Sequence, residues 1–289
     1  MNEYLKGDLN PKILLNHCTN LNMLGGLKNW RTAQTDLTSL LKRDSLSEQS
    51  RIAALNQRGL SLRMTNQYYA AESDFLAARN LAHEKGWLAT ELTALAGLID
   101  VHRTGDRDTA PFVFGKHLDI AQTYQQEAEN IVKQIPTSNV PKIDALLQFG
   151  LLSLETEKYG YTSALRYYHD AKLACDELRR SDLTNVTLIN RQARINLLQG
   201  GVYEKLGIHK KIAGKKDAMD YYYAAYDDYS VVRDIRGIAN AALGMARMCT
   251  IGYSKIALYK WACEVTQDKD PELHQMAEIG LAQLLQASV

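Results

Sequence analysis

A recurring spacing of small and large side chains most constrains how this chain of 289 residues can fold. Its clearest copy consists of Leu55, Gly59, Tyr68, Ala71, Phe75 and Ala78. Gly59 and Ala71 are small where two helices would cross closely, and Tyr68 and Phe75 can fill the volume beside that crossing. The apolar spacing predicts one helix over Ile52–Thr65 and a second over Tyr68–His83. A repeated helix pair of this kind is typical of an α-helical solenoid.

Fainter copies of the spacing run through nearly the whole chain. Copies of the second helix lie at Trp30, Ala33, Leu37 and Leu40, at Tyr161, Ala164, Tyr168 and Ala171, and at Ala218, Tyr222 and Ala225. The glycines of the first helices are unevenly spaced and are Gly59, Gly97, Gly150, Gly201 and Gly244. Because a glycine inside a helix costs about 0.5–1 kcal/mol relative to alanine, its recurrence indicates a packing role.

This pattern resembles the tetratricopeptide repeat (TPR) family, in its variant with longer helices. The resemblance implies an all-α fold, a right-handed α-α solenoid of about five or six helix-turn-helix repeats. We expect a single domain over residues 1–289, closed by a capping helix over 271–287. The segment 135–141 (IPTSNVP) is the best candidate for a minor break. The resemblance also implies that the first helix of each pair lines a concave binding surface.

Charge and composition exclude few function classes but favour a cytoplasmic protein. A net charge of +1 predicts no strong field, so neither nucleic acid nor a membrane surface is favoured as a partner. No apolar run is long enough to cross a bilayer, and the first residues lack the pattern of a secretory signal. The four cysteines form no CxxC pair, which indicates reduced thiols.

No catalytic motif is present, so we expect no enzyme, no cofactor and no metal. His102 with Asp100 and Asp106 comes nearest to a metal cluster, but a solvated helix end is the simpler interpretation. His169 beside Asp170 is interpreted as a surface residue. An enzyme would require a cleft in which polar groups converge and pKa values are shifted.

The register of the first helices predicts which side chains face the inner surface. The predicted groove residues are Leu60, Met64, Leu98, Val101, Leu147, Leu151, Leu198, Val202, Met245 and Met248. These side chains are apolar, so they form either an open groove that binds a peptide or helical segment, or ordinary core. Both interpretations stay open at this point. Asn56 alone matches the inward polar residues with which the family clamps a C-terminal carboxylate, which argues against that ligand.

Basic residues on both sides of Gly201 are candidate electrostatic contacts with a partner. They are Arg191, Arg194, Lys205, Lys210, Lys211, Lys215 and Lys216. The segment 205–216 is interpreted as a solvated loop, with a phosphate backbone or an acidic peptide as the alternative ligand.

The leading hypothesis is a non-catalytic adaptor or regulator that binds a protein or peptide segment in its apolar concave groove. One alternative is a structural subunit of a larger assembly that uses the convex face or the ends of the solenoid. Another is nucleic-acid binding through the lysine-rich segment 205–216. These hypotheses leave the partner and the oligomeric state open.

Overall fold

The computed structural model describes residues 10–105, 111–156, 160–207, 217–249, 252–267 and 270–286. Within these ranges the chain is all-α, with helices α2 to α14 and no strand. The chain divides into two compact units, Met1–Lys158 (unit 1) and Tyr159–Val289 (unit 2). The segment 135–141, predicted as the minor break, falls inside unit 1.

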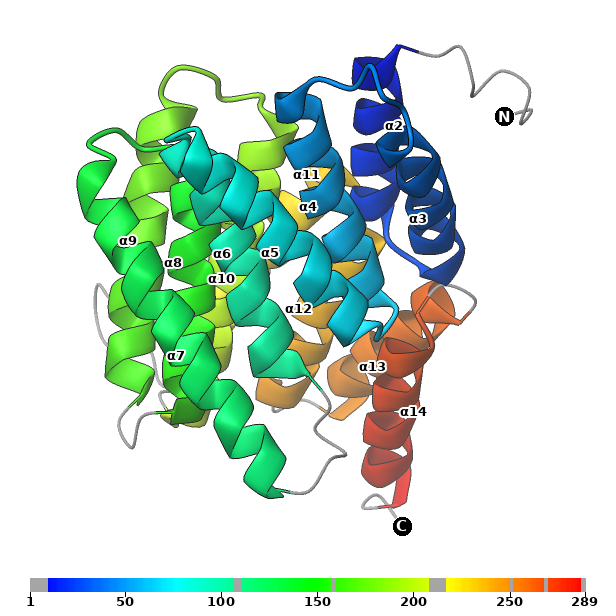
Figure 1. Ribbon diagram of the computed structural model, residues 1–289. Helices are drawn as coiled ribbons and strands as arrows, with labels where there is room; N and C mark the ends of the chain where they lie inside the picture. Colours follow the sequence, from blue (N-terminus) through cyan, green and yellow to red (C-terminus); the bar gives the residue numbers. More distant parts are fainter. Residues whose placement is uncertain are drawn as a thin grey trace. The chain divides into compact units, whose positions relative to one another are not determined.

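Unit 1 is a stack of helices that pack in chain order (Figure 1). Its helices are α2 (Pro11–Leu24), α3 (Leu27–Leu41), α4 (Glu48–Met64), α5 (Tyr68–Glu84), α6 (Leu88–Thr104), α7 (Pro111–Gln134) and α8 (Val140–Thr156). Each helix contacts the next, and α2, α4, α6 and α8 also contact one another in succession. These four helices therefore form an inner row, and α3, α5 and α7 form an outer row.

Unit 2 follows the same plan, from α9 in green to α14 in red (Figure 1). Its helices are α9 (Gly160–Arg179), α10 (Val186–Lys205), α11 (Ala218–Val232), α12 (Ile235–Met248), α13 (Gly252–Thr266) and α14 (Pro271–Gln286). Here α10, α12 and α14 form the inner row, and α14 packs on both α13 and α12. The order of packing in both units confirms the predicted all-α fold of helices stacked in sequence.

Several helices begin at a residue whose side chain caps the first turn. The Asn185 side chain accepts a hydrogen bond from the backbone N–H of Leu188, and that of Asp234 accepts one from Gly237. Asp217 and Asp220 form a reciprocal capping box at the start of α11. Because the first N–H groups of a helix have no partner within it, such caps fix where each helix begins.

Aromatic rings of the outer row pack directly on glycines of the inner row. Phe75 is 4% exposed and lies between Gly59 of α4 and Gly97 of α6. Tyr222 is 1% exposed and lies against Gly200 of α10 and Gly244 of α12. A Cβ atom added at Gly97 or Gly244 would lie 2.4 Å from a ring carbon, which is closer than packed atoms approach. The predicted packing role is thereby confirmed for Gly59, Gly97 and Gly244, whereas on α10 it is Gly200 rather than Gly201 that lies in close contact with the ring.

This contact predicts opposite effects for two alanine substitutions in unit 2. Gly244→Ala would push a methyl group into the Tyr222 ring, and we expect a loss of about 1–3 kcal/mol in the free energy of unfolding. At Gly201 the nearest atom to an added Cβ is the Tyr222 hydroxyl at 3.8 Å. Gly201→Ala should therefore raise the free energy of unfolding by about 0.5–1 kcal/mol. Urea denaturation followed by circular dichroism measures both, and equal effects would contradict the account.

Candidate functional site

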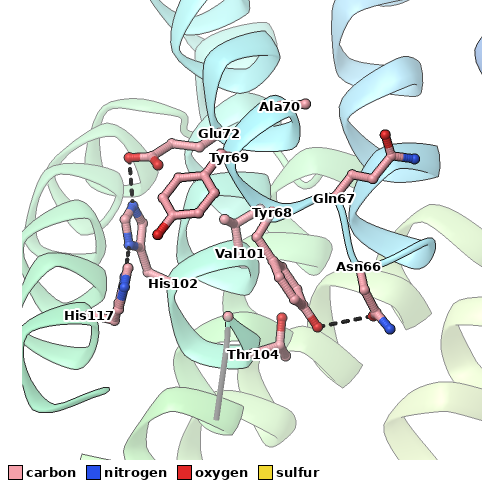
Figure 2. Close-up of a pocket in the computed structure, with 11 residues that line it drawn as sticks. Asn66, Gln67, Tyr68, Tyr69, Ala70, Glu72, Val101, His102, Thr104 and His117 are labelled. Carbon is pink, nitrogen blue, oxygen red and sulfur yellow. Dashed lines mark hydrogen bonds and ion pairs between the residues drawn. The ribbon is translucent and has the colours of Figure 1, made fainter. Parts of the chain in front are cut away.

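A cavity of about 620 Å³ lies in unit 1 where α5 begins, α6 ends and α7 passes. The turn before α5 and its first residues contribute Asn66, Gln67, Tyr68, Tyr69, Ala70 and Glu72 (Figure 2). The end of α6 and α7 contribute Val101, His102, Thr104, Gly105 and His117. We call this space the His102 cavity. Its volume lies within the range of about 300–1,000 Å³ that is usual for ligand pockets.

A chain of three side chains crosses one wall of the His102 cavity. His102 lies between Glu72 and His117 in Figure 2. Its Nε2 is 3.1 Å from Oε1 of Glu72, and its Nδ1 is 2.9 Å from Nδ1 of His117. The His102 side chain is 2% exposed, so both ring nitrogens depend on these two partners.

The hydrogen bonds assign the protons of this chain. Burial, the largest effect, and the neighbouring His117 lower the pKa of His102 below its ordinary value of 6.5, although Glu72 acts to raise it. His102 is therefore neutral near pH 7. A carboxylate can only accept, so Nε2–H of His102 donates to Glu72 and leaves Nδ1 as an acceptor. His117 must then donate its Nδ1–H to His102, and in the neutral form of His117 the other ring nitrogen, Nε2, carries a lone pair.

The turn that precedes α5 shapes the mouth of the cavity. Asn66 has a φ of 61°, in the left-handed region that asparagine tolerates better than most residues. The Tyr68 hydroxyl donates to Oδ1 of Asn66 at 3.1 Å, which fixes the Tyr68 ring. Tyr69, by contrast, is 81% exposed. The cavity thus presents one fixed and one exposed tyrosine.

Ion pairs behind the cavity hold the end of α6 in place. Arg103 is 8% exposed and contacts Asp100 at 2.7 Å and Glu155 of α8 at 3.0 Å. Arg63 of α4 contacts the same Asp100 at 2.7 Å. Because removal of one partner of a buried ion pair is costly, this network ties α6 firmly to both of its inner-row neighbours.

His102 and Asp100 do not form the solvated helix end that the sequence favoured, because they are only 2% and 9% exposed. Asp100 pairs with arginines, and Asp106 lies outside the described residues. Within the described residues, no group of three or more His, Cys, Asp or Glu side chains could hold a metal ion. Glu72 and His117 were missed because they are distant in sequence. The signal that could have found them is topological, since the start of α5, the end of α6 and the start of α7 meet at one edge of the stack.

The predicted groove residues fall into two groups by burial. Those that are buried, at 0–3% exposure, are Leu98, Val101, Leu147, Val202 and Met245. Leu60 is 37% exposed, and those that are partly exposed are Met64, Leu151, Leu198 and Met248. The buried members are core, as the second interpretation of the sequence expects, because α6 and α12 each have neighbours on most sides. Whether the exposed members bind a partner stays a prediction.

A shallow groove does lie on the inner row of unit 1, and both polar and small apolar side chains line it. The groove has a volume of about 430 Å³ and crosses α2, α4 and α6. Its polar lining residues are Lys12, Asn16, Thr19, Asn56, Gln57, Thr90 and Thr93. Small apolar contacts come from Leu15, Ala53, Ala89 and Pro141. We call this the unit 1 groove.

The predicted electrostatic contacts lie in unit 2. Arg191 donates to the backbone oxygen of Thr187 at 3.3 Å, Arg194 is partly exposed, and Lys205 is exposed at the end of α10. The remaining predicted contacts, which lie outside the described residues, are Lys210, Lys211, Lys215 and Lys216. Their role stays a prediction.

Comparison with known proteins yields no assignment: no protein-family model matches this sequence, and no curated protein matches it. The resemblance to the TPR family therefore stays a prediction that rests on the spacing of residues such as Gly59 and Phe75. Among the helices of the described ranges, none combines the length and hydropathy that a bilayer-spanning segment requires.

The lowered pKa of His102 predicts how stability depends on pH. The unfolded chain binds a proton at this histidine near pH 6.5, whereas the folded chain binds it only at lower pH. The stabilisation is thus complete above about pH 6.5 and is lost as pH falls toward the folded pKa. We expect the thermal midpoint of wild type to fall between about pH 7.5 and 5, and His102→Gln to flatten that fall. Equal slopes for wild type and His102→Gln would refute the assignment.

Proposed function

We propose that the chain is a non-catalytic interaction module that binds an extended segment of another protein in the unit 1 groove. The observation that carries the proposal is the set of amide and hydroxyl side chains that line the groove across three successive inner-row helices, with Lys12 as the one charged residue of the described lining. The main chain of an extended peptide offers alternating N–H and C=O groups, and a surface of amides and hydroxyls can pair with both.

Two lining side chains have their hydrogen-bonding roles fixed by neighbours. Asn22 donates to the side-chain oxygen of Gln57 at 3.0 Å, so the Gln57 amide N–H₂ group is left as a donor. The Thr93 hydroxyl donates to the backbone oxygen of Ala89 at 3.2 Å and keeps its lone pairs as acceptors. A donor and an acceptor of fixed identity thus stand on adjacent inner helices. This arrangement supports recognition of a peptide main chain.

The proposal changes the source of affinity that the sequence predicted. Apolar anchors were expected, but Leu98 and Leu147 are both 0% exposed and are part of the core. Hydrogen bonds to the main chain, with small apolar contacts from Leu15 and Pro141, take the place of those anchors. Selection among partners would then depend on side chains at the edges of the groove. The role of an adaptor or regulator rests on the resemblance to the TPR family, since fold alone does not imply function.

The His102 cavity supports binding more than catalysis. It does combine convergent polar groups with a shifted pKa, as an active site would. Its one aliphatic hydroxyl among the described lining residues, that of Thr104, donates to the backbone oxygen of Asp100 at 2.6 Å. The described lining holds no serine or cysteine, and its one threonine hydroxyl is already engaged as a donor.

A groove-filling substitution tests the proposed function. Thr90→Tyr places a ring in the unit 1 groove at a partly exposed position, and Thr123→Tyr makes the same change on the exposed face of α7. Peptides selected by the wild-type chain from a random displayed library should bind the Thr123→Tyr variant equally well. We expect Thr90→Tyr to raise the dissociation constants of these peptides by about tenfold or more, because the groove can no longer contact their main chain.

Fluorescence anisotropy with the selected peptides gives the dissociation constants, and circular dichroism checks that both variants are folded. If no peptide is selected, or if the selected peptides bind all three proteins alike, the unit 1 groove is not the binding surface.

A further inference from the structure

The His102 cavity presents hydrogen-bond acceptors rather than donors from its Glu72–His102–His117 wall. Glu72 uses Oε1 to accept from His102 and retains Oε2 as a further acceptor. Because Nδ1 of His117 donates to His102, the neutral form of His117 has a lone pair on Nε2. A ligand that fits this wall must therefore supply N–H or O–H donors.

The charge of the lining residues also favours a ligand with N–H or O–H donors. Glu72 is the one carboxylate among the described residues that line the cavity, and no lysine or arginine is among them. The nearby guanidinium groups form ion pairs elsewhere. Arg63 and Arg103 both pair with Asp100, and Arg79 pairs with Glu127. With His102 neutral, none of the described residues that line the cavity places a cation beside the Glu72 carboxylate.

Two tyrosine rings complete the lining at the mouth. Tyr68 is held by Asn66, and Tyr69 is 81% exposed. The face of a tyrosine ring attracts an ammonium or guanidinium group, and it loses little conformational freedom in doing so. Carboxylate, neutral acceptors and aromatic faces together are the features of a site for an organic cation.

We propose that the His102 cavity binds an alkylammonium or guanidinium group, with Glu72 as its counter-ion and His117 Nε2 as a second acceptor. The cation is either the side chain of a lysine or arginine in a peptide or a free small amine. A metal ion is a poorer fit, because His102 uses both ring nitrogens within the chain and does not converge with Glu72 and His117 on one point. The proposal is independent of the unit 1 groove, whose lining residues are all different.

Isothermal titration calorimetry of the full chain with small defined probes tests the proposal. The probes are acetyl-Gly-Arg-Gly-amide, its citrulline counterpart, and agmatine as the free cation. Citrulline has nearly the shape of arginine but no charge, so we expect it to bind at least about tenfold more weakly than the arginine peptide. Tighter binding of the arginine peptide than of agmatine would identify a peptide side chain as the source of the cation, and the reverse order a free amine.

Two pairs of variants locate the binding. Glu72→Gln removes the charge but keeps an oxygen that can accept from His102, whereas Glu84→Gln makes the same change at an exposed position of the same helix. We expect Glu72→Gln to weaken the arginine peptide by about tenfold and Glu84→Gln to have no effect. Tyr69 is too exposed to support the fold, so Tyr69→Leu should weaken binding of the arginine peptide several-fold without unfolding the chain. Tyr223→Leu, the matched change at an exposed tyrosine of unit 2, should leave binding of the peptide unchanged.

Three outcomes would overturn the proposal. They are equal binding of the arginine and citrulline peptides, an unchanged affinity in a folded Glu72→Gln variant, and no binding of either cationic probe at millimolar concentration.

Discussion

The fold depends on the contact between an outer-row aromatic ring and the glycines of the inner row. Phe75 lies on Gly59 and Gly97, and Tyr222 lies on Gly200 and Gly244. In each case the ring lies against two successive inner helices, so one side chain sets the spacing of two neighbouring repeats. Interiors pack at nearly crystalline density, and a single added methyl group at such a point has no room. The glycines are therefore the positions where the stack tolerates least change.

The sequence predicted this contact well because it is local. Helix period and the spacing of small and large residues together locate Gly59 and Phe75. The surface was predicted less well, because α6 is an inner helix with neighbours on most sides and exposes only a narrow strip. Thr90 and Thr93 lie on that strip, whereas Leu98 and Val101 face the core. Register within a helix decides which residues are exposed, and an apolar pattern does not show how wide the exposed strip is.

The pairing of polar side chains could not be predicted from the sequence, for a different reason. Glu72, His102 and His117 lie on three helices, and only their meeting at one edge of the stack brings them together. Arg63, Asp100 and Arg103 form a second such group beside them. The first group gives the His102 cavity its acceptors and the second fixes the end of α6 that carries His102. Together they place a polar cavity on a scaffold that hydrophobic packing builds.

The chemistry of the His102 cavity depends on which ring nitrogens of His102 and His117 carry protons. Long-range ¹H–¹⁵N NMR of the histidine rings at about pH 7.5 measures it directly, because protonated and unprotonated ring nitrogens differ in ¹⁵N shift. The account predicts that His102 carries its proton on Nε2 and His117 carries its proton on Nδ1. The opposite tautomer of His102, with its proton on Nδ1, should be no more than a minor population. A neutral His117 with its proton on Nε2, or a His102 that is cationic at this pH, would contradict it.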